Sequence, residues 1–304
     1  MEKPLVSVIT INYDHPDVTC ALLESLRQIT YPSIEVIVVD NASPNDDPAI
    51  ISQSYPEIIF IQSDVNLGFA GGNNLGIRKA KGKYILLLNN DTEVDPGFIE
   101  PLVAKLEADN KIGAVSPKIK FYFQPDTIQF SGQAPINPYT MRSYGYGWGA
   151  RDTGKFDRDT LTSFVHGAAM MVPMDVIKKV GMMAEIYFLY YEELDWGSRI
   201  RAAGYELWYV HNSTVMHKES LSTGKLSPFK TYYINRSRLI YLRRNVHGFP
   251  FLVAFLYLFL IAIPKNAFSF LLRRQKGHFK AYVKAVTWNV KNLFINDIHA
   301  NPKL

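Results

Sequence analysis

The chain has 304 residues, so it is longer than a typical single domain and can bury a large core. Its one cysteine, Cys20, excludes a disulfide framework and favours a core thiol in the cytosol. The net charge of +5 hides an asymmetry, because residues 1–217 carry a net charge of −8 and residues 218–304 carry +13, with 15 basic and 2 acidic side chains.

The first segments of the chain are typical of a βαβ unit. Residues 6–11 and 36–39 are apolar, β-branched runs that end in polar residues, Asn12 after the first and Asp40 with Asn41 after the second. Between them, apolar residues recur at helical spacing, with acids near the start, where they suit the helix dipole. Because parallel strands end at the same edge of a sheet, these polar side chains should face one crevice.

A third apolar run, residues 58–61, leads into a glycine-rich segment. Asn66 and Gly68 are followed by Gly71, Gly72 and Gly76, where we expect a new helix to open. Glycines at a helix N-terminus let backbone amides approach a phosphate. A glycine cluster after a strand is also typical of a simple turn, and the segment alone does not decide between the two.

The stretch at 84–94 is the most informative part of the chain. Residues 85–88 are apolar, as in a buried parallel strand, and they stop abruptly at Asn89, Asn90 and Asp91. A carboxylate with amide neighbours at the carboxyl edge of an open α/β sheet favours a cation site. Asp91 has a second interpretation as the cap of the following helix, but polar residues at four successive strand ends argue for a shared site.

A group of acids lies in the C-terminal half. Glu192, Glu193 and Asp195 fall in the first turn of a helix that ends at Gly204, a typical C-cap. Acids there complement the helix dipole, which explains their position without any function. The aromatic residues just before them should partly desolvate the carboxylates, which raises a pKa toward the range that suits a general base.

Two histidines and one irregular segment are open to two interpretations. His217 follows an apolar strand, residues 207–210, and a turn near Asn212, while His166 stands in the apolar run 164–172. A lone histidine is usually structural, so neither position indicates a function by itself. Residues 133–155 contain Trp148, other aromatic side chains and four glycines, which suits either a mobile loop that binds sugar rings or a packed surface loop.

The tail combines apolar and basic stretches. Residues 249–263 form a run of 15 residues without charge, and after an interruption at Pro264 and Lys265 the run resumes at 267–272, with basic residues on both sides. This run is shorter than the ~20 residues of a spanning helix, and basic flanks do not favour a simple crossing. An interfacial helix or hairpin on anionic lipid fits better, and a helix buried in the core is the alternative.

The sequence shows neither a signal peptide nor a recognised nucleic-acid-binding motif. The apolar run at 5–11 is too short for a signal peptide, so we expect a cytoplasmic protein that is peripheral on the cytosolic face of a membrane. No recognised nucleic-acid motif accompanies the basic tail, so we expect no nucleic-acid partner.

Five segments of the chain carry a resemblance to a known family. They read VSVITINY, IEVIVVDNAS, NLGFAGGNNLGI, YILLLNNDTEVDPGFI and YYEELDWGSRIRAAGY, in this order over roughly residues 4–245. Together they resemble family 2 glycosyltransferases of the GT-A fold, in particular the rhamnosyltransferase-like branch. The resemblance implies an α/β fold with a Rossmann-like, mostly parallel central sheet flanked by helices. We expect a catalytic domain at 1–245, with a nucleotide-binding half at 1–110 and an acceptor-binding half at 111–245, and a helical, membrane-associating tail at 246–304.

The resemblance also implies ligands for the nucleotide and a metal. Asp40, with Asn41 beside it, matches the family's aspartate that binds the nucleobase or ribose. The family's Asp-x-Asp motif, which holds a divalent cation against the diphosphate, falls on residues 89–91, where Asn89 replaces the first acid and leaves Asp91 alone. One carboxylate implies weak, substrate-assisted binding of Mg²⁺ or Mn²⁺. The implied nucleotide-sugar-binding residues are Thr10, Asn12, Asp40, Asn41, Asn66, Gly68, Phe69, Ala70, Asn73 and Asn90, and the implied metal ligands are Asp91 and His217.

The catalytic base is implied by a Glu-Asp pair whose second acid is the base in the family. Here that position is Glu193, a longer side chain than usual, and Glu192 and Asp195 are the other catalytic candidates. The candidates for the acceptor side are Trp148, His166 and Gly167.

The resemblance therefore implies an inverting, metal-dependent glycosyltransferase. It would move a sugar, with rhamnose from dTDP-rhamnose suggested by the branch, to a lipid-linked or polysaccharide acceptor in cell-surface glycan synthesis. Two alternatives belong to other classes. A catalytically silent subunit would bind nucleotide sugar without turnover, and a nucleotidyltransferase would release pyrophosphate.

Overall fold

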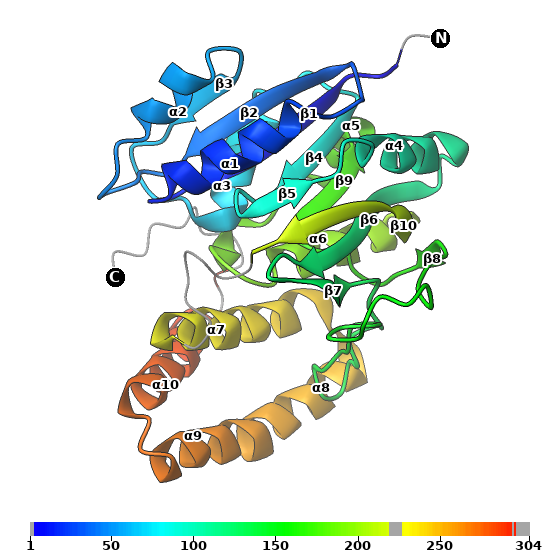
Figure 1. Cartoon of the computed structure of the whole chain (residues 1–304). Coiled ribbons are helices and arrows are strands. Elements are labelled where there is room, and N and C mark those ends of the chain that lie inside the picture. The colour runs from blue at the N-terminus through cyan, green and yellow to red at the C-terminus, as the bar shows by residue number, and fades with distance from the viewer. Residues whose placement is uncertain (1–2, 219–226, 294, 296–304) are drawn as a thin grey trace.

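The computed structural model describes residues 3–218, 227–293 and 295. In this part of the chain, ten strands form one sheet with helices on both faces, and a further group of helices lies to one side of it (Figure 1). The strands in sheet order are β3 (Ile59–Gln62), β2 (Ile34–Asp40), β1 (Val6–Asn12), β4 (Tyr84–Leu88), β9 (Ala169–Pro173), β6 (Ile112–Phe121), β10 (Glu206–His217) and β5 (Thr92–Val94), with β7 (Gln124–Phe130) beside β6 and β8 (Thr160–Leu161) beside β10.

Most of the long strands point the same way. β1 is parallel to β2 and β4, β2 is parallel to β3, and β10 is parallel to β6. β9 is antiparallel to both β4 and β6, so those two strands share a direction. Polar strand ends therefore meet at one edge, where Asn12 lies opposite Asp40. The expected α/β class with a helix-flanked central sheet is confirmed, and the antiparallel strands make the sheet mixed.

Each face of the sheet packs against its own hydrophobic core. Helices α1 (Pro16–Leu26), α2 (Ala49–Ser54) and α4 (Ile99–Ala108) contribute to one core, and α3 (Gly68–Ile77), α5 (Met174–Val180) and α6 (Glu192–Ala202) contribute to the other. Val6 and Val8 belong to the first core, while Ile9 belongs to the second, because successive strand residues point to opposite faces. A short 3₁₀ turn, η1 (Glu185–Tyr187), precedes α6.

The glycine-rich segment forms part of a helix. α3 begins at Gly68, earlier than expected, so Gly72 and Gly76 lie inside it. A Cβ on Gly72 would lie 2.9 Å from Ile11 Cδ1, and one on Gly76 would lie 2.5 Å from Ile9 Cγ2. These two glycines let α3 pack closely on β1, a role that neither sequence interpretation included.

Strand β10 corrects a second expectation. The sequence predicted a short strand followed by a turn near Asn212, but β10 continues from Glu206 to His217. Its pairing with β6 shifts register between Val210 and Thr214, so the polar residues form a bulge rather than a turn. The bulge leaves His217 inside the strand, at the carboxyl edge of the sheet.

The irregular segment at 133–155 is held in place by hydrogen bonds and ion pairs. Isolated bridges pair Gln133 with Gly145 and Asn137 with Arg142. The buried ammonium of Lys118 on β6 forms ion pairs with Asp152 and Asp157. These contacts match the packed-loop interpretation more closely than that of a freely mobile loop.

The C-terminal helices form a frame that begins at α7 (Pro228–Asn245) (Figure 1). The Ser227 side chain accepts a hydrogen bond from the Lys230 amide, which caps α7. The chain then forms α8 (Gly248–Tyr257), a π-helical turn η2 (Leu258–Ala262), α9 (Ile263–Leu272) and α10 (Lys276–Lys291). α10 lies along α7, since Thr231 Oγ1 is 2.8 Å from His278 Nδ1, and Arg243 donates to the Asn292 carbonyl.

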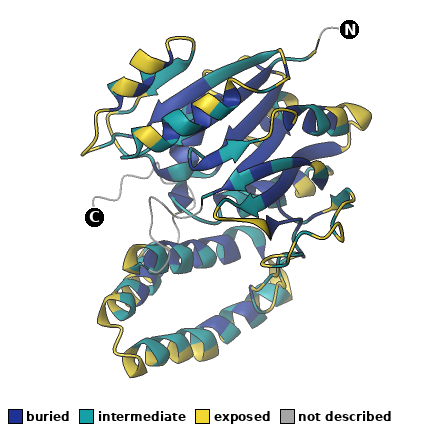
Figure 2. Ribbon diagram, in the orientation of Figure 1, coloured by how far each residue is buried: buried dark blue, intermediate teal, exposed yellow. Residues whose placement is uncertain are grey.

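Pro264 and Lys265 interrupt the apolar run in the sequence but do not interrupt the helix. α8, η2 and α9 form one helix of 25 residues, Gly248–Leu272. Proline lacks an N–H and clashes with the carbonyl four residues earlier, and the wider π turn just before it accommodates both. Among the described residues, this is the helix that could cross a membrane by length and composition. Only 11% of its most apolar 18-residue window is buried, which contradicts the alternative of a buried core helix (Figure 2).

Candidate active site

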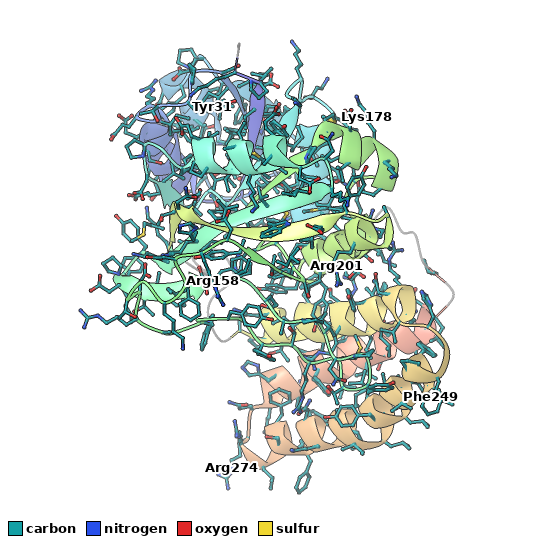
Figure 3. The ribbon with its side chains drawn as sticks, turned by 90° about the vertical axis from the view of Figure 1, so that its right-hand side faces the viewer. Tyr31, Arg158, Lys178, Arg201, Phe249 and Arg274 are labelled. Carbon is teal, nitrogen blue, oxygen red and sulfur yellow. The ribbon has the colours of Figure 1, made fainter. Side chains whose placement is uncertain are left out.

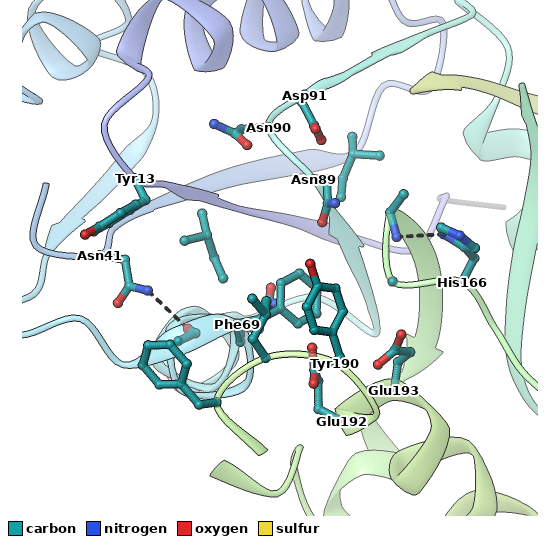
Figure 4. Close-up of a pocket in the computed structure, with 18 of the residues that line it drawn as sticks. Tyr13, Asn41, Phe69, Asn89, Asn90, Asp91, His166, Tyr190, Glu192 and Glu193 are labelled. Atoms are coloured by element: carbon teal, nitrogen blue, oxygen red, sulfur yellow. Dashed lines mark hydrogen bonds between the residues drawn. The ribbon is translucent and has the colours of Figure 1, made fainter. Parts of the chain in front are cut away.

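A cavity of about 390 Å³ lies at the carboxyl edge of the sheet (Figure 4). Residues that follow β1 and β4 line one side of it, and the segment that enters α6 lines the other. The predicted site residues that line the cavity are Asn41, Asn66, Gly68, Phe69, Asn73, Asn90, Asp91, His166, Gly167, Glu192, Glu193 and His217. The structure places the other candidates, Thr10, Asn12, Asp40, Ala70, Trp148 and Asp195, outside this lining.

The predicted nucleotide-binding side of the cavity is held together by amide side chains. Asn41 Nδ2 donates to the Gly68 carbonyl and to Asn66 Oδ1, both at 3.1 Å, and Asn41 Oδ1 accepts from the Leu67 amide. Asn66 Oδ1 also accepts from the Gly68 amide. This network fixes the start of α3, where Gly68 has a φ of +69° and a Cβ would collide with the carbonyl oxygen of Phe188.

Asp40 lies behind this wall rather than on it. Its carboxylate is fully buried and accepts hydrogen bonds from Asn12 Nδ2 at 2.8 Å and from the Ser43 hydroxyl at 2.6 Å. Asn12 Oδ1 in turn accepts from Thr19. In this arrangement Asp40 orders the loop after β2, and its contact with a nucleobase or ribose stays a prediction.

Asp91 and His217 form the polar edge of the cavity. His217 Nδ1 lies 2.8 Å from Gln129 Oε1, an oxygen that can only accept, so Nδ1 carries the proton. With Nδ1 directed at Gln129, Nε2 is the ring nitrogen that faces Asp91, and it lies 3.1 Å from Asp91 Oδ1. Two electron-rich atoms at this separation are suited to share a cation, and the outer partner Gln129 fixes the tautomer as such partners do in metal sites.

The donor set at this edge is small. Among the described residues, no group of three or more His, Cys, Asp or Glu side chains is arranged to hold a metal. Asp91 and His217 are both more than nine-tenths buried, so a bound cation would be shielded from bulk water. Mg²⁺ and Mn²⁺ accept oxygen ligands from substrate phosphates, so the two side chains fit a cation that is completed by a diphosphate.

The segment that enters α6 has an unusual backbone. Phe188, Tyr190 and Tyr191 have φ values of +65°, +64° and +75°. This left-handed region costs non-glycine residues ~1 kcal/mol or more each, and it persists only where surrounding contacts enforce it. One such contact joins the two sides of the cavity, because the Phe69 amide donates to the Phe188 carbonyl at 2.6 Å.

Helix α7 supplies the other contacts to this segment. Arg236 Nη2 donates to the Ile186 carbonyl, and the Ser237 hydroxyl lies 3.0 Å from the Leu189 carbonyl and 3.4 Å from that of Tyr187. Both α7 side chains are buried. The strained segment is therefore held from behind by α7 and in front by α3.

Glu192 and Glu193 enter the cavity from the start of α6, across from Asn89, Asn90 and Asp91 (Figure 4). Burial raises the pKa of Glu193 to about 7, although nearby backbone N–H groups oppose the shift. Burial, and then the charge of Glu193, raises the pKa of Glu192 well above its usual range. Each keeps one buried carboxylate oxygen with no hydrogen-bond partner among the described residues. Near neutral pH the pair can thus provide a proton acceptor, Glu193, beside a protonated neighbour.

Asp195 has a different environment from its two neighbours. Its carboxylate is 1% exposed and forms ion pairs with Arg199 at 2.9 Å and Arg244 at 3.1 Å. Burial would raise the pKa of Asp195, but the two guanidinium groups outweigh it and lower the pKa below its usual range. Asn245 Nδ2 also donates to Asp195. Asp195 therefore ties α6 to the end of α7 and does not reach the cavity.

The three acceptor candidates lie in different places. His166 and Gly167 line the cavity, and a Cβ on Gly167 would lie 3.7 Å from Glu193 Oε1. His166 Nδ1 accepts from the Ala168 amide, and burial, followed by the charge of His217, lowers the pKa of His166 to about 3, so its ring is neutral. Trp148 is 69% exposed and contacts Phe121 edge-on, away from the cavity.

Several residues that line the cavity were not predicted from the sequence. Gln129 comes from β7, whose residues carry no motif, and Tyr13 follows β1. Tyr190 was noted only as an aromatic neighbour of the acids. Lys230 lies in the first turn of α7, and the Ser-Pro helix start before it was the one sequence signal that could have placed it near a structured edge.

Comparison with known families finds one match over much of the chain. The model described as Glycosyl transferase family 2 matches residues 7–181. The chain is also 23% identical over 241 residues to an N-acetylglucosaminyl-diphospho-decaprenol L-rhamnosyltransferase from Mycobacterium tuberculosis, covering 73% of this chain and 78% of the relative.

Two solved structures show the same fold. One is a mannosyltransferase from Pyrobaculum calidifontis in complex with GDP-Man and Mn²⁺, with a TM-score of 0.56, 17% identity, and coverage of 97% of this chain and 82% of that chain. The other is GalNAc-T7 with UDP, GalNAc and Mn²⁺, with a TM-score of 0.67, 16% identity, and coverage of 95% of this chain and 57% of that chain. At these identities the likeness supports the fold, and the cavity residues must support the chemistry.

Proposed function

This chain belongs to glycosyl transferase family 2, and from that premise we propose that it is an inverting, divalent-cation-dependent glycosyltransferase. The observation that carries the proposal is the division of the cavity. Asp91 and His217, an acid and a histidine suited to hold a cation, line the same cavity as a carboxyl group whose pKa is raised to about 7, that of Glu193. Departure of a diphosphate and removal of a proton from the acceptor require these two environments within one cavity.

The donor is proposed to lie along the start of α3 and the end of β4. Asn66 and Asn73 would offer amide groups to a nucleoside, with Asn41 holding Asn66 in place, and Asn90 stands beside Asp91 at the proposed diphosphate end. A bound Mg²⁺ or Mn²⁺ would neutralise charge on the leaving diphosphate. Asp91 and His217 would hold it together with the diphosphate oxygens, in line with the Mn²⁺ named for both structural neighbours.

Glu193 is proposed as the general base. Its carboxylate takes the proton of the acceptor hydroxyl, the acceptor oxygen forms a bond to the anomeric carbon, and the bond from that carbon to the diphosphate oxygen breaks. Attack from the face opposite the diphosphate inverts the anomeric centre. Gly167 lies next to Glu193 Oε1 without a side chain, which leaves room for the incoming hydroxyl.

The sugar and acceptor are proposed from the relatives. The name of the mycobacterial relative supports rhamnose as the sugar and a polyprenyl-diphosphate-linked acceptor. The donor dTDP-rhamnose and a role in cell-surface glycan synthesis are proposed from the resemblance to the rhamnosyltransferase-like branch. A lipid-linked acceptor places the reaction at the cytosolic face of a membrane, where the exposed apolar helix Gly248–Leu272 provides an attachment. A polysaccharide acceptor remains compatible with the same cavity.

A thermal-shift panel tests the donor site. We expect one nucleotide class among dTDP-, UDP- and GDP-sugars to raise the melting temperature, and to do so more with Mn²⁺, because selective ligands stabilise the folded state by mass action. Asp91→Asn should lose the Mn²⁺-dependent part of the shift while keeping the melting temperature of the free protein. No shift with any nucleotide sugar, or equal Mn²⁺ dependence in Asp91→Asn, would remove this cavity as the donor site.

A further inference from the structure

Helix Gly248–Leu272 exposes an apolar stripe along its full length. Its members are Phe249, Leu252, Leu256, Leu260, Phe268 and Leu272, which we call the outer stripe. Phe249 is 71% exposed, Leu260 70% and Leu272 67%. Apolar surface of this extent is rare on a monomeric protein unless something covers it.

The π-helical turn keeps the stripe on one face. In a regular α-helix, the twelve residues from Leu256, before the π turn, to Phe268, after it, would place the later side chain about 120° away from the earlier one around the helix axis. One residue added by a π turn reduces this offset to about 20°. The turn at Leu258–Ala262 therefore aligns the part before Pro264 with the part after it.

Both ends of this helix are connected to helices that pack against each other, α7 at its start and α10 at its end. Its start follows the end of α7 directly, and its end is joined to α10, whose Gly277 lies beside Pro228 at the start of α7. The helix thus runs antiparallel to α7, and Phe249 and Arg274 lie at opposite ends of the frame (Figure 3). If this helix crossed a bilayer, the antiparallel α7 would lie at the depth of the hydrocarbon core, together with the strained segment before α6 that α7 contacts. Because α7 carries four arginines and charges are costly at that depth, we expect no crossing.

We propose that helix Gly248–Leu272 lies flat in the interfacial layer of an anionic bilayer, with the outer stripe in the acyl chains. This deepens the membrane location and lipid-linked acceptor of the proposed function and rests on that function only for the acceptor. With the helix in this position, the end of α9 and the start of α7 beside it would both lie at the membrane surface. The start of α7 carries Lys230, which lines the cavity. A lipid-linked diphosphate could then reach the cavity without leaving the bilayer.

Charge distinguishes a bilayer from a second copy of the chain as the occupant. Residues 228–293 contain 12 lysines and arginines and no acidic residue. In α7, Arg236 is buried and Arg244 pairs with Asp195, so the exposed charge beside the stripe comes from Lys265 and the residues after α9. Arg273, Arg274 and Lys276 stand at the end of the outer stripe. Two such surfaces would repel each other in a dimer, whereas anionic lipid headgroups attract them.

Vesicle co-sedimentation of the full-length protein tests the surface. We expect binding to phosphatidylcholine vesicles that contain phosphatidylglycerol, weaker binding to pure phosphatidylcholine, and loss with salt. Phe249→Ser should weaken partitioning of the protein onto these vesicles by about tenfold, because one large apolar side chain fewer is buried in the bilayer. Phe123→Ser is the matched control, because Phe123 is also 71% exposed but lies between β6 and β7, and it should bind as the wild type.

The depth of the helix tests its orientation. Leu252→Cys, Leu260→Cys and Leu272→Cys, each in a Cys20→Ser background and labelled with an environment-sensitive fluorophore, should be quenched to equal extents by a shallow lipid-attached quencher. A spanning helix would instead bury the label at 260 most deeply and leave the other two shallow, and that result would overturn the proposal. So would equal vesicle binding by the wild type and Phe249→Ser, or a stripe covered by dimerisation in lipid-free buffer.

The outcome is separable from that of the transfer reaction. Vesicle binding requires neither donor nor turnover, so a protein that seats flat but transfers no sugar contradicts the proposed function and keeps the membrane surface. A protein that transfers sugar to a soluble acceptor and never binds vesicles contradicts the surface and keeps the reaction.

Discussion

At the scale of single residues, Glu193 separates from the acids around it by its environment. Glu192, Glu193 and Asp195 are close in sequence, yet Asp195 is neutralised by Arg199 and Arg244, whereas Glu193 keeps a raised pKa in the cavity. Replacing Glu193 with Gln should keep donor binding and lower transfer by ~10² to 10⁴, the usual contribution of a general base. Kinetics with saturating donor would measure this loss.

Glu193→Asp provides the matched control for that variant. It restores the residue that the family pattern has at this position and keeps a proton acceptor, so it should retain measurable activity. Wild-type transfer by Glu193→Gln, together with an inactive Glu192→Gln that still binds donor, would assign the base to Glu192.

The raised pKa of Glu193 also predicts a pH dependence. Activity should fall below about pH 7, where the base becomes protonated. A folded-state pKa above the ordinary ~4.3 means that the carboxyl contributes stability below that value and loses it as pH rises through about 7. Glu193→Gln should therefore raise the melting temperature more at pH 8 than at pH 4. The corresponding gain in the free energy of unfolding has an upper limit of about 4 kcal/mol. An equal effect at both pH values would contradict the raised pKa.

Sequence patterns identified some of these residues and not others. Asp91 and Glu193 follow a buried strand and an aromatic cluster, and both patterns are visible in the chain. Gln129 and Lys230 reach the cavity only because β7 pairs with β6 and α7 returns beside the catalytic segment, and no local periodicity reports such long-range placement. The separation of Asp195 from the cavity depends on Arg244, 49 residues away.

At the scale of elements, α7 packs behind residues 188–191, the strained segment that leads into α6, and holds it in place. Ser237→Ala removes the hydroxyl that contacts the Tyr187 and Leu189 carbonyls, so the strained residues 188–191 should relax. We expect kcat to fall by about tenfold and the acid limb of the pH profile to move to lower pH, because the pKa of Glu193 depends on its buried position. Donor KM should change less.

Thr231→Ala is the matched control on the same helix. Thr231 also carries a hydroxyl of α7, but it contacts His278 on α10 instead of the catalytic segment. Thermal melting should show similar small losses in both variants, while the pH profile should move only in Ser237→Ala. An unchanged pH profile in folded Ser237→Ala would reduce Ser237 to ordinary packing. Ser237→Cys, which keeps the volume and a weak donor, should be intermediate and provides the test if the alanine variant does not fold.

Elements were predictable where their pattern was local. The strands at 6–12, 34–40 and 84–88 follow from apolar, β-branched runs with polar ends. The continuation of helix Gly248–Leu272 through Pro264 was not predictable, because a π turn inserts a residue that composition does not reveal. The bulge in β10 was missed for a related reason, since its polar residues resemble a turn until β6 pairs on both sides of them.

At the scale of the whole molecule, the C-terminal helices are a structural part of the enzyme. α10 covers α7, where the Arg236 guanidinium lies 4.3 Å from the Trp288 ring centroid and Asn289 Nδ2 donates to the Arg236 carbonyl. Truncation after Val246 should therefore expose α7 and lower the melting temperature by many degrees. Phe249→Ser, which alters only the exposed stripe, should melt as the wild type. A truncated protein with wild-type stability and activity would show that the tail is an independent anchor.

The central claim is sugar transfer from a nucleotide diphosphate by Asp91 and Glu193 in one cavity. The most direct measurement incubates the wild type with dTDP-rhamnose, Mn²⁺ and a polyprenyl-diphosphate-linked sugar, and quantifies both the released nucleotide and the extended acceptor. We predict equal amounts of dTDP and rhamnosylated acceptor, with inverted anomeric configuration, and almost none of either with Asp91→Asn or Glu193→Gln. Release of pyrophosphate, donor binding without turnover, or wild-type transfer by both variants would contradict the account.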